Sequence, residues 1–500
     1  MNLSYFVKKF PLEESFPIKS RPYFNHSVEF KKISTSKERA EMLDRVGLNV
    51  FFFPSEMITG CDFLSDSGTT TMTNEQWAAL HLGDEAYGSN RGYFILREQI
   101  TNLFGDGFFN ALELARPNAF IFHQGRPCED ALFTVIGQLG RGLIIPGNGH
   151  FDTTEANIKE NHIQAVNLFS QELKDGNSKS FFKGNMDVIA LKKLLTVSKA
   201  KIPLVFLTIT NNTGGGQPVS MQNIKEVSEI THFYKIPLFF DACRFAENAW
   251  FIKRYEKDYR NKTIKEIVQE MFNFVDGFII SFKKDGLVNM GGGLFLKDRG
   301  LFIKKYPHIP DALMNYQIRT EGHPSYGGMS GRDIMTLTIG LKTVIKEEYL
   351  DYRINQVRAF GKNMQEEGIP VLMPIGGHAV YLDINKFFDG TNMKQGDFGG
   401  IAFTALLLAN YGYRACELGC FAFGSHNPET TEEIFPEVNF VRFAVPRLRY
   451  EKQDLDSAVI AVKKLHEDKD KIPPIEVTYG KDLPLRHFKA RFRFKSQKIK

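Results

Sequence analysis

Short apolar runs alternate with longer amphipathic stretches between residues 70 and 335. The runs are apolar throughout and lie at 119–122, 143–146, 204–209, 237–240 and 277–281. Polar or glycine-containing loops follow them, which is typical of parallel strands covered by helices on both faces of a sheet. A helical pattern at 221–234 ends just before the strand at 237. The alternation predicts an α/β fold with an open, mostly parallel sheet.

The pattern changes near residue 335. One long helix is predicted over 331–358, then strands at 371–373, 379–382, 412–417 and 439–444, with helices at 401–410 and 454–465. A chain of 500 residues is too long for one compact core. We therefore expect a large domain over 67–335 and a smaller α+β domain over 336–500, to which the N-terminal segment 1–66 also belongs.

Composition and charge exclude several classes of protein. Hydrophobic residues make up 43% and charged residues 24% of the chain, which is ordinary for a soluble globular protein. The net charge of +5 is spread along the chain, so no nucleic-acid binding is expected. The chain has no apolar run of membrane-spanning length and no signal-peptide pattern at its N-terminus. Its five scattered cysteines form no zinc pattern and favour a reduced, cytoplasmic location.

Three chemical signals follow predicted strands, where open α/β sheets place their ligands. Lys284 comes just after the run 277–281, and a lysine of lowered pKa can form a Schiff base. Asp241 ends another strand, and a carboxylate there can pair with a protonated pyridine nitrogen. Gly125 and Arg126 lie at a strand-to-helix turn suited to a phosphate group. Taken singly, each also fits an ordinary loop or helix cap.

The order of these signals is similar to that of pyridoxal-phosphate (PLP) enzymes of the aspartate aminotransferase fold, also called fold type I. Over about residues 47–494, the chain resembles the β-eliminating lyases, the family of tryptophanase and tyrosine phenol-lyase. The motifs that carry the resemblance are Ser65-Asp-Ser-Gly-Thr-Thr, Gly83-Asp-Glu-Ala-Tyr-Gly, His123-Gln-Gly-Arg, Gly215-Gly-Gln-Pro-Val-Ser, Lys283-Lys-Asp, Pro324-Ser-Tyr-Gly-Gly, Gly376-Gly-His-Ala and Val441-Arg-Phe-Ala-Val-Pro-Arg. The resemblance implies elimination of the side chain of an aromatic amino acid, which yields pyruvate and ammonia.

The resemblance also implies a set of cofactor-binding residues. Lys284 should carry PLP and later take the Cα proton of the substrate, and Asp241 should bind the pyridine nitrogen. The remaining cofactor-binding residues are Gln124, Gly125, Arg126 and Ser281 around the phosphate, Phe151 stacked on the ring, Asn212 and Arg244 at its phenolic oxygen, and Lys283 beside the carrier lysine.

Substrate and cation residues are implied in the same way. Tyr87 should protonate the leaving group, and Tyr326 should approach from a neighbouring subunit of a homotetramer with shared active sites. The substrate-binding residues are Arg442 at the α-carboxylate and Phe51, Ser67, Asp152, Leu418 and His487. Glu85 and the backbone oxygens of Gly68 and Asn289 match a monovalent-cation site, for which oxygen ligands suit potassium.

Three positions indicate the leaving group. Leu418 stands where tyrosine phenol-lyases carry an arginine that pairs with the phenol, whereas Asp152 and His487 resemble tryptophanase. The sequence therefore favours tryptophan, with indole as the leaving group. Three alternatives stay open: a phenol-lyase, a relative that acts on a modified aromatic or S-substituted amino acid, including by β-replacement, and a catalytically inactive relative. Pro127 and Cys243 depart from the family pattern.

Overall fold

The computed structural model describes residues 21–24, 27–109, 117–175, 178–426, 432–436 and 438–495. The chain divides into two compact units, 1–30 and 31–500. Parts of the predicted N-terminal segment (1–20 and 25–26) and of the predicted C-terminal domain (427–431, 437 and 496–500) lie outside the described residues. The predicted domain boundaries at 66 and 335 stay predictions, and the features below belong to the unit 31–500.

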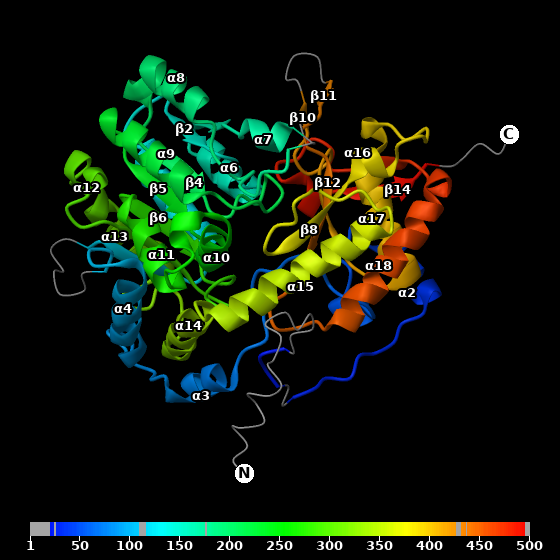
Figure 1. Ribbon diagram of the computed structural model, residues 1–500, viewed down its shortest axis with the longest axis horizontal. Coiled ribbons are helices and arrows are strands. Elements are labelled where there is room, and N and C mark those ends of the chain that lie inside the picture. Colours follow the sequence, from blue (N-terminus) through cyan, green and yellow to red (C-terminus); the bar gives the residue numbers. More distant parts are fainter. Residues whose placement is uncertain are drawn as a thin grey trace, which may run out of the picture. The chain divides into compact units, whose positions relative to one another are not determined.

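The described part of the chain forms a seven-stranded sheet with the strand order β1-β7-β6-β5-β4-β2-β3 (Figure 1). The strands are β1 (Ala119–Phe122), β2 (Ile144–Gly147), β3 (Gln164–Asn167), β4 (Val205–Thr208), β5 (Leu238–Asp241), β6 (Gly277–Ser281) and β7 (Gly292–Leu296). Neighbouring strands from β3 to β6 are parallel, and β7 is antiparallel to both β1 and β6. The predicted α/β fold with a mostly parallel sheet is confirmed.

Helices cover both faces of this sheet because its strands are apolar on both sides. In β5, Leu238 and Phe240 belong to one buried cluster, whereas Phe239 belongs to another, as the alternation of side chains along a strand requires. The first cluster includes side chains of α4 (Arg91–Phe104), α8 (Val188–Ser198), α9 (Met221–Phe233), α10 (Phe245–Tyr255), α11 (Ile264–Asn273) and α14 (Gly331–Val344). The second includes side chains of α5 (Gly125–Gly137), α6 (Asp152–Glu160), α12 (Leu301–Lys305) and α13 (Ile309–Glu321).

A smaller sheet, in the order β8-β12-β9, lies among the C-terminal elements. Its strands are β8 (Ala379–Asp383), β12 (Phe440–Ala444) and β9 (Cys416–Leu418), all antiparallel. A further buried cluster joins β8 and β12 to α2 (Ser36–Arg45), α17 (Gly399–Tyr411), α18 (Lys452–Glu467) and the hairpin of β13 (Ile475–Tyr479) and β14 (Arg491–Phe494). Chain segments near residues 43–63 and 357–492 thus share one apolar core.

The single helix predicted over 331–358 is wrong. The structure has two helices, α14 and α15 (Glu347–Glu366), because the backbone of Lys346 is extended. The first half of α15 contributes Leu350 and Ile354 to the core of the large sheet, and the second half contributes Val357 and Phe360 to the C-terminal core. Helix α15 therefore links the two groups of elements, and Figure 1 shows it crossing between them.

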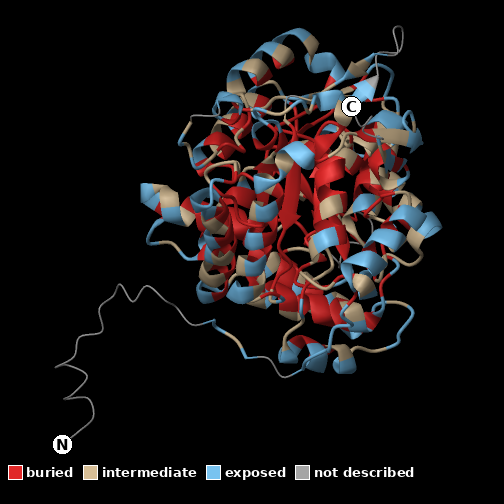
Figure 2. Ribbon diagram, turned by 90° about the vertical axis from the view of Figure 1, so that its right-hand side faces the viewer, coloured by how far each residue is buried: buried red, intermediate tan, exposed pale blue. Residues whose placement is uncertain are grey.

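Burial follows this arrangement. Figure 2 shows buried residues along the strands and the inner faces of the helices, and exposed residues along the outer faces. No helix among the described residues is both long enough and apolar enough to cross a membrane.

Candidate active site

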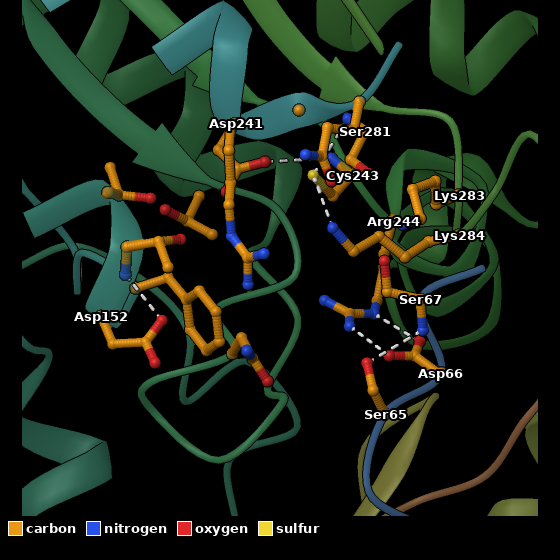
Figure 3. A pocket seen from close by; sticks show the side chains of 18 of the residues that line it. Ser65, Asp66, Ser67, Asp152, Asp241, Cys243, Arg244, Ser281, Lys283 and Lys284 are labelled. Carbon is orange, nitrogen blue, oxygen red and sulfur yellow. Dashed lines mark hydrogen bonds and ion pairs between the residues drawn. The ribbon is translucent and has the colours of Figure 1, made fainter. Parts of the chain in front are cut away.

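A cavity lies at the carboxyl ends of the parallel strands, the position at which open α/β sheets bind ligands. Its walls come from the loops after β1, β2, β4, β5 and β6, and from β9, β12 and the C-terminal turn at 486–488. Most of the predicted site residues line it: Phe51, Ser67, Gln124, Gly125, Arg126, Phe151, Asp152, Asn212, Asp241, Arg244, Ser281, Lys283, Lys284, Leu418, Arg442 and His487. Figure 3 shows Asp152 on one side of this cavity and Lys283 and Lys284 on the other.

Lys284 and Asp241 are connected through Cys243. The Nζ atom of Lys284 donates to Cys243 Sγ at 3.5 Å, and the Cys243 backbone N–H donates to Asp241 Oδ1 at 3.2 Å (Figure 3). Burial, together with the charge of Asp241, raises the pKa of the Cys243 thiol to about 12. The thiol therefore stays neutral beside the lysine amine near neutral pH. The identity of Cys243 was noted in the sequence, but this contact was not predicted.

At the predicted phosphate loop, two segments of the backbone approach each other closely. A Cβ atom on Gly125 would lie 2.7 Å from Ser281 Cβ, so only glycine fits there. Gly125 begins helix α5, whose first turn has no side-chain cap from Gln124. Pro127 also lies in this first turn, where proline is tolerated because its missing N–H would have no partner within the helix. The turn therefore offers backbone N–H groups and Arg126 to an anion.

Asp66 is a site residue that sequence reasoning missed. Its carboxylate accepts two hydrogen bonds from Arg244, at 2.8 and 3.1 Å, and one from Arg447 at 3.0 Å. Burial raises the pKa of Asp66, but the two guanidinium groups outweigh it and hold the pKa well below its usual value. Asp66 therefore fixes Arg244 at the cavity wall. The quoted motif at 65–70 contained the only sequence signal for it.

Asn212 is oriented by a buried network from the C-terminal elements. Its Oδ1 atom accepts from the Tyr381 hydroxyl at 2.6 Å and from Arg442 Nη1 at 3.4 Å, and His378 Nε2 lies 3.1 Å away. Burial and the nearby Arg244 hold the pKa of His378 well below its usual value, so its ring is neutral. Because the oxygen is engaged, the amide NH2 group is the part of Asn212 that can donate to a ligand.

Arg442 lies on β12, lines the cavity and can bind an anion there. Its Nη2 atom donates to the carbonyl oxygen of Leu64 at 2.9 Å. Its buried Nε atom has no hydrogen-bond partner among the described residues. A buried guanidinium nitrogen of this kind is suited to a carboxylate ligand.

The end of the cavity near Phe51 and His487 is aromatic and apolar, with one polar pair. Phe51 packs against Phe488 with ring centroids 4.7 Å apart and against His487 at 5.9 Å. Leu418 and Cys416 also line this region. The Nε2 atom of His487 lies 3.0 Å from Asp152 Oδ2, and both side chains are buried. This end can enclose an aromatic ring and offer it a polar contact.

Two predicted residues lie outside the cavity of the chain that carries them. Tyr87 is 74% exposed, and its ring packs against Tyr326, with centroids 5.6 Å apart, and against His323 at 5.9 Å. A hydrogen bond with Tyr326 raises the pKa of Tyr87. The structure therefore brings Tyr87 and Tyr326 together, but not with Lys284.

The predicted cation ligands are only partly brought together. The Gly68 carbonyl oxygen accepts from the Asn289 side-chain amide at 2.8 Å, and the Gly68 N–H donates to the Lys283 carbonyl at 2.7 Å. Glu85 instead forms an exposed ion pair with Arg332. Among the described residues, no group of three or more His, Cys, Asp or Glu side chains could hold a metal ion.

Comparison with known proteins identifies the family. The model of the family "Beta-eliminating lyase" matches residues 62–461. The chain belongs to the β-eliminating lyase family. It is 39% identical to a probable beta-eliminating lyase from Trichomonas vaginalis, over 96% of this chain and 98% of that protein. It is also 38% identical to a tyrosine phenol-lyase from Fusobacterium nucleatum (96% and 99%) and 37% identical to a tryptophanase from Rhodobacter capsulatus (94% and 98%).

Solved structures show the same fold at low sequence identity. A putative kynurenine aminotransferase from Saccharomyces cerevisiae superposes with a TM-score of 0.58 and 15% identity, over 87% of this chain and 95% of that one. A threonine aldolase from Leishmania major gives a TM-score of 0.53 and 14% identity, over 81% and 99%. The β-eliminating lyase chain therefore has fold type I, as predicted.

PLP is the cofactor expected of a β-eliminating lyase, and the cavity residues fit it. The glycine-lined turn with Arg126 suits a phosphate, Phe151 offers an aromatic face, and Asp241 offers a carboxylate at a strand end. Lys284 offers a primary amine in the same cavity. Glu129, Cys416 and Phe488 also line the cavity, and sequence reasoning assigned no role to them because no local pattern distinguishes them from core residues.

Proposed function

We propose that this β-eliminating lyase acts on L-tryptophan and releases indole, pyruvate and ammonia. The observation that carries the proposal is that Leu418 and the buried Asp152–His487 pair line the same cavity, where Phe51 packs against both Leu418's cluster and His487. Overall similarity does not favour one substrate, because a tyrosine phenol-lyase and a tryptophanase are almost equally identical to this chain. The proposal therefore rests on the residues around the leaving group.

The chemistry of the two leaving groups supports indole. A phenol oxygen needs a donor or a cation in its pocket, and the leucine at 418 supplies neither. An indole ring has a large apolar area and one N–H donor, which needs an acceptor when buried. Phe51 and Phe488 supply ring contacts, and Asp152 with His487 supplies polar atoms at the same end.

The proposed roles follow from the position of each side chain. PLP, when bound, supplies the electron sink that stabilises negative charge at Cα. Arg442 holds the α-carboxylate through its buried Nε atom, which orients the Cα–H bond. The amine of Lys284 takes the Cα proton. The Cys243 thiol beside this amine is neutral, so its sulfur carries no negative charge that would compete with the amine. Asn212 and Arg244 donate to the ring oxygen, and Asp241 pairs with the ring nitrogen.

We also propose that active sites are shared between subunits of a homotetramer. Tyr87 and Tyr326 lie outside their own cavity but contact each other, and Glu85 is exposed nearby in sequence. If these side chains face the cavity of a second copy, Tyr87 can protonate the leaving group there. Glu85 can then complete a potassium site with the carbonyl oxygens of Gly68 and Asn289. A cytoplasmic location remains a prediction from the pattern of cysteines.

The test is turnover by purified protein supplied with PLP and potassium. Tryptophan, tyrosine and S-methylcysteine are offered separately, and pyruvate and the released group are measured. Indole from tryptophan with little phenol from tyrosine is the expected result, and replacing potassium by sodium should lower the rate. The variant Leu418→Arg should lose tryptophan turnover and gain phenol release.

Each other outcome contradicts a different part of the proposal. Phenol as the main product would overturn the choice of tryptophan and leave a β-eliminating lyase. Pyruvate from S-methylcysteine alone would indicate an S-substituted substrate. Pyruvate from none of the three, with PLP bound, would overturn the proposed elimination itself.

A further inference from the structure

Glu129 is a buried carboxyl group of the cavity that has no role in the proposed reaction. It lies on α5, three residues after Arg126, and is only 7% exposed. It lines the same cavity as Asp241 and Lys284. A buried ionisable group at a ligand site is uncommon and needs a physical explanation.

Glu129 joins two helices of the cavity. The Thr154 hydroxyl donates to its Oε1 atom at 2.5 Å, and the Asn157 amide donates to Oε2 at 3.2 Å. Both donors lie on α6, whose first residue follows Phe151 directly. Glu129 therefore holds α6 against α5. Helix α6 positions Phe151, the proposed stacking residue, and α5 begins at the phosphate loop.

These two partners are neutral, which sets Glu129 apart from Asp66 and Asp152 in the same cavity. Asp66 pairs with Arg244, and Asp152 faces His487. Within the described part of the chain, Glu129 forms no ion pair with a lysine, arginine or histidine. Its direct hydrogen-bond partners are therefore dipoles and not charges.

Titratable and charged groups from several elements line the same cavity as Glu129. They are Arg126 on α5, Asp152 on α6, Asp241 on β5, Cys243 and Arg244 after β5, Lys283 and Lys284 after β6, Asp66 from the N-terminal side, and Arg442 and His487 from the C-terminal elements. Burial, followed by the charge of Asp241, raises the pKa of Glu129 to about 7, and the Thr154 hydrogen bond and Lys284 only partly oppose this. Two carboxyl groups at one buried site do not easily ionise together.

Given the proposed function, we propose that Glu129 is a positioning residue that holds Phe151 through α6 and releases a proton when PLP binds. Asp241 would hold PLP by its ring nitrogen, and a protonated nitrogen there would supply a positive charge. With its charge paired in this way, Asp241 would repel the Glu129 carboxylate less, which would favour the ionised form of Glu129. The proton that Glu129 carries in the free protein passes to solvent on binding.

The sign of the pH dependence follows from linkage. Glu129 has a higher pKa in the folded, cofactor-free protein than in the unfolded chain. Its contribution to stability is full below the ordinary pKa of a glutamate and is lost as pH rises through about 7. Because binding lowers this pKa, the affinity for PLP should rise as pH increases toward about 7 and should level off above it. A shift of one pKa unit on binding corresponds to roughly a tenfold change in affinity.

The experiment measures the dissociation constant of PLP for the full-length apoprotein, from about pH 5.5 to 8.5. Wild type is compared with Glu129→Gln, which keeps the shape of the side chain but cannot ionise. The matched control is Glu155→Gln, because Glu155 lies on α6, the helix that Glu129 contacts, but pairs with Lys159 instead. The ratio of the Glu129→Gln constant to the wild-type constant should change by about tenfold across this range, and the control ratio should stay constant.

The outcomes separate this inference from the proposed function. A constant ratio for Glu129→Gln, with PLP bound by wild type, would overturn the role of Glu129 and leave the lyase proposal standing. No binding of PLP by wild type at any pH would overturn both. If Glu129→Gln does not fold, Thr154→Val provides the second test. It removes a donor to the ionised carboxylate, so the wild-type pH profile should move to higher pH, and an unmoved profile would overturn the inference.

Discussion

At the scale of single residues, His487 and Asp152 define the polar contact at the leaving-group end of the cavity. Their Nε2 and Oδ2 atoms are 3.0 Å apart, and both side chains are buried. The variant His487→Phe keeps the aromatic wall with Phe51 and Phe488 but removes the polar atom. We expect kcat/KM for tryptophan to fall by about tenfold or more. For S-methylcysteine, which has no ring to contact, we expect a fall of less than about threefold.

The comparison of the two substrates distinguishes recognition from a general loss of structure. The variant His466→Phe serves as the control, because His466 lies on α18 and packs against Phe387 outside the cavity. Equal losses for both substrates in His487→Phe would refute a role in binding the leaving group.

Residues next to predicted strands were placed well from sequence, because a strand end fixes where its neighbours lie. Asp241 and Lys284 both line the cavity. Asp66 and Glu129 were missed because only the fold brings them there. Asp66 follows a segment far from the arginines that bind it, and no spacing in the sequence indicates that contact.

At the scale of elements, the buried strands β1, β2, β4, β5 and β6 were predicted because they are apolar on both faces. The buried strand β7, which begins with two glycines, was not predicted. The edge strand β3 was missed because its residues are mostly exposed or half-buried, so no apolar run marks it. The break between α14 and α15 was missed because neither proline nor glycine lies there. The two helices separate because α14 packs against α3 (Asn74–Leu82) and α4, whereas α15 packs against α10 and α18. Tertiary contacts thus overrode the local helical pattern.

Arg447 connects several of these elements through buried charges. It donates to Asp66 at 3.0 Å, to Glu247 on α10 at 2.7 Å and to Asp285 after β6 at 3.0 Å. The variant Arg447→Met leaves three buried acids without this partner. We expect the free energy of unfolding to fall by about 3–5 kcal/mol, measured by guanidinium unfolding.

The exposed pair of Arg493 and Glu476 provides the matched control for this measurement. Arg493→Met removes the same charge at the surface and should leave the free energy of unfolding nearly unchanged, because exposed ion pairs contribute little to stability. Similar losses in the two variants would show that the buried network does not hold the elements together.

At the scale of the whole molecule, one chain supplies most of the proposed site but not all of it. The cavity combines residues from near 51–67 with residues from β5, β6, β9 and β12. Tyr87 and Tyr326 lie together elsewhere, and Tyr87 is largely exposed. Sequence reasoning named these residues by resemblance and predicted that Tyr326 serves a neighbouring subunit, but it did not predict which copy of the chain Tyr87 serves.

Subunit complementation tests whether Tyr87 acts in the cavity of a second copy. Tyr87→Phe and Lys284→Ala chains should each be nearly inactive alone. In a mixed assembly, the cavity with an intact Lys284 can meet a neighbour with an intact Tyr87, so random association should restore about a quarter of wild-type activity. The control pairs Asp241→Ala with Lys284→Ala, because both residues line the cavity of one chain. That mixture should stay inactive, since no cavity regains both residues. Failure of the Tyr87→Phe mixture to exceed the sum of its parents, with mixed assemblies shown to form, would place Tyr87 outside any shared site.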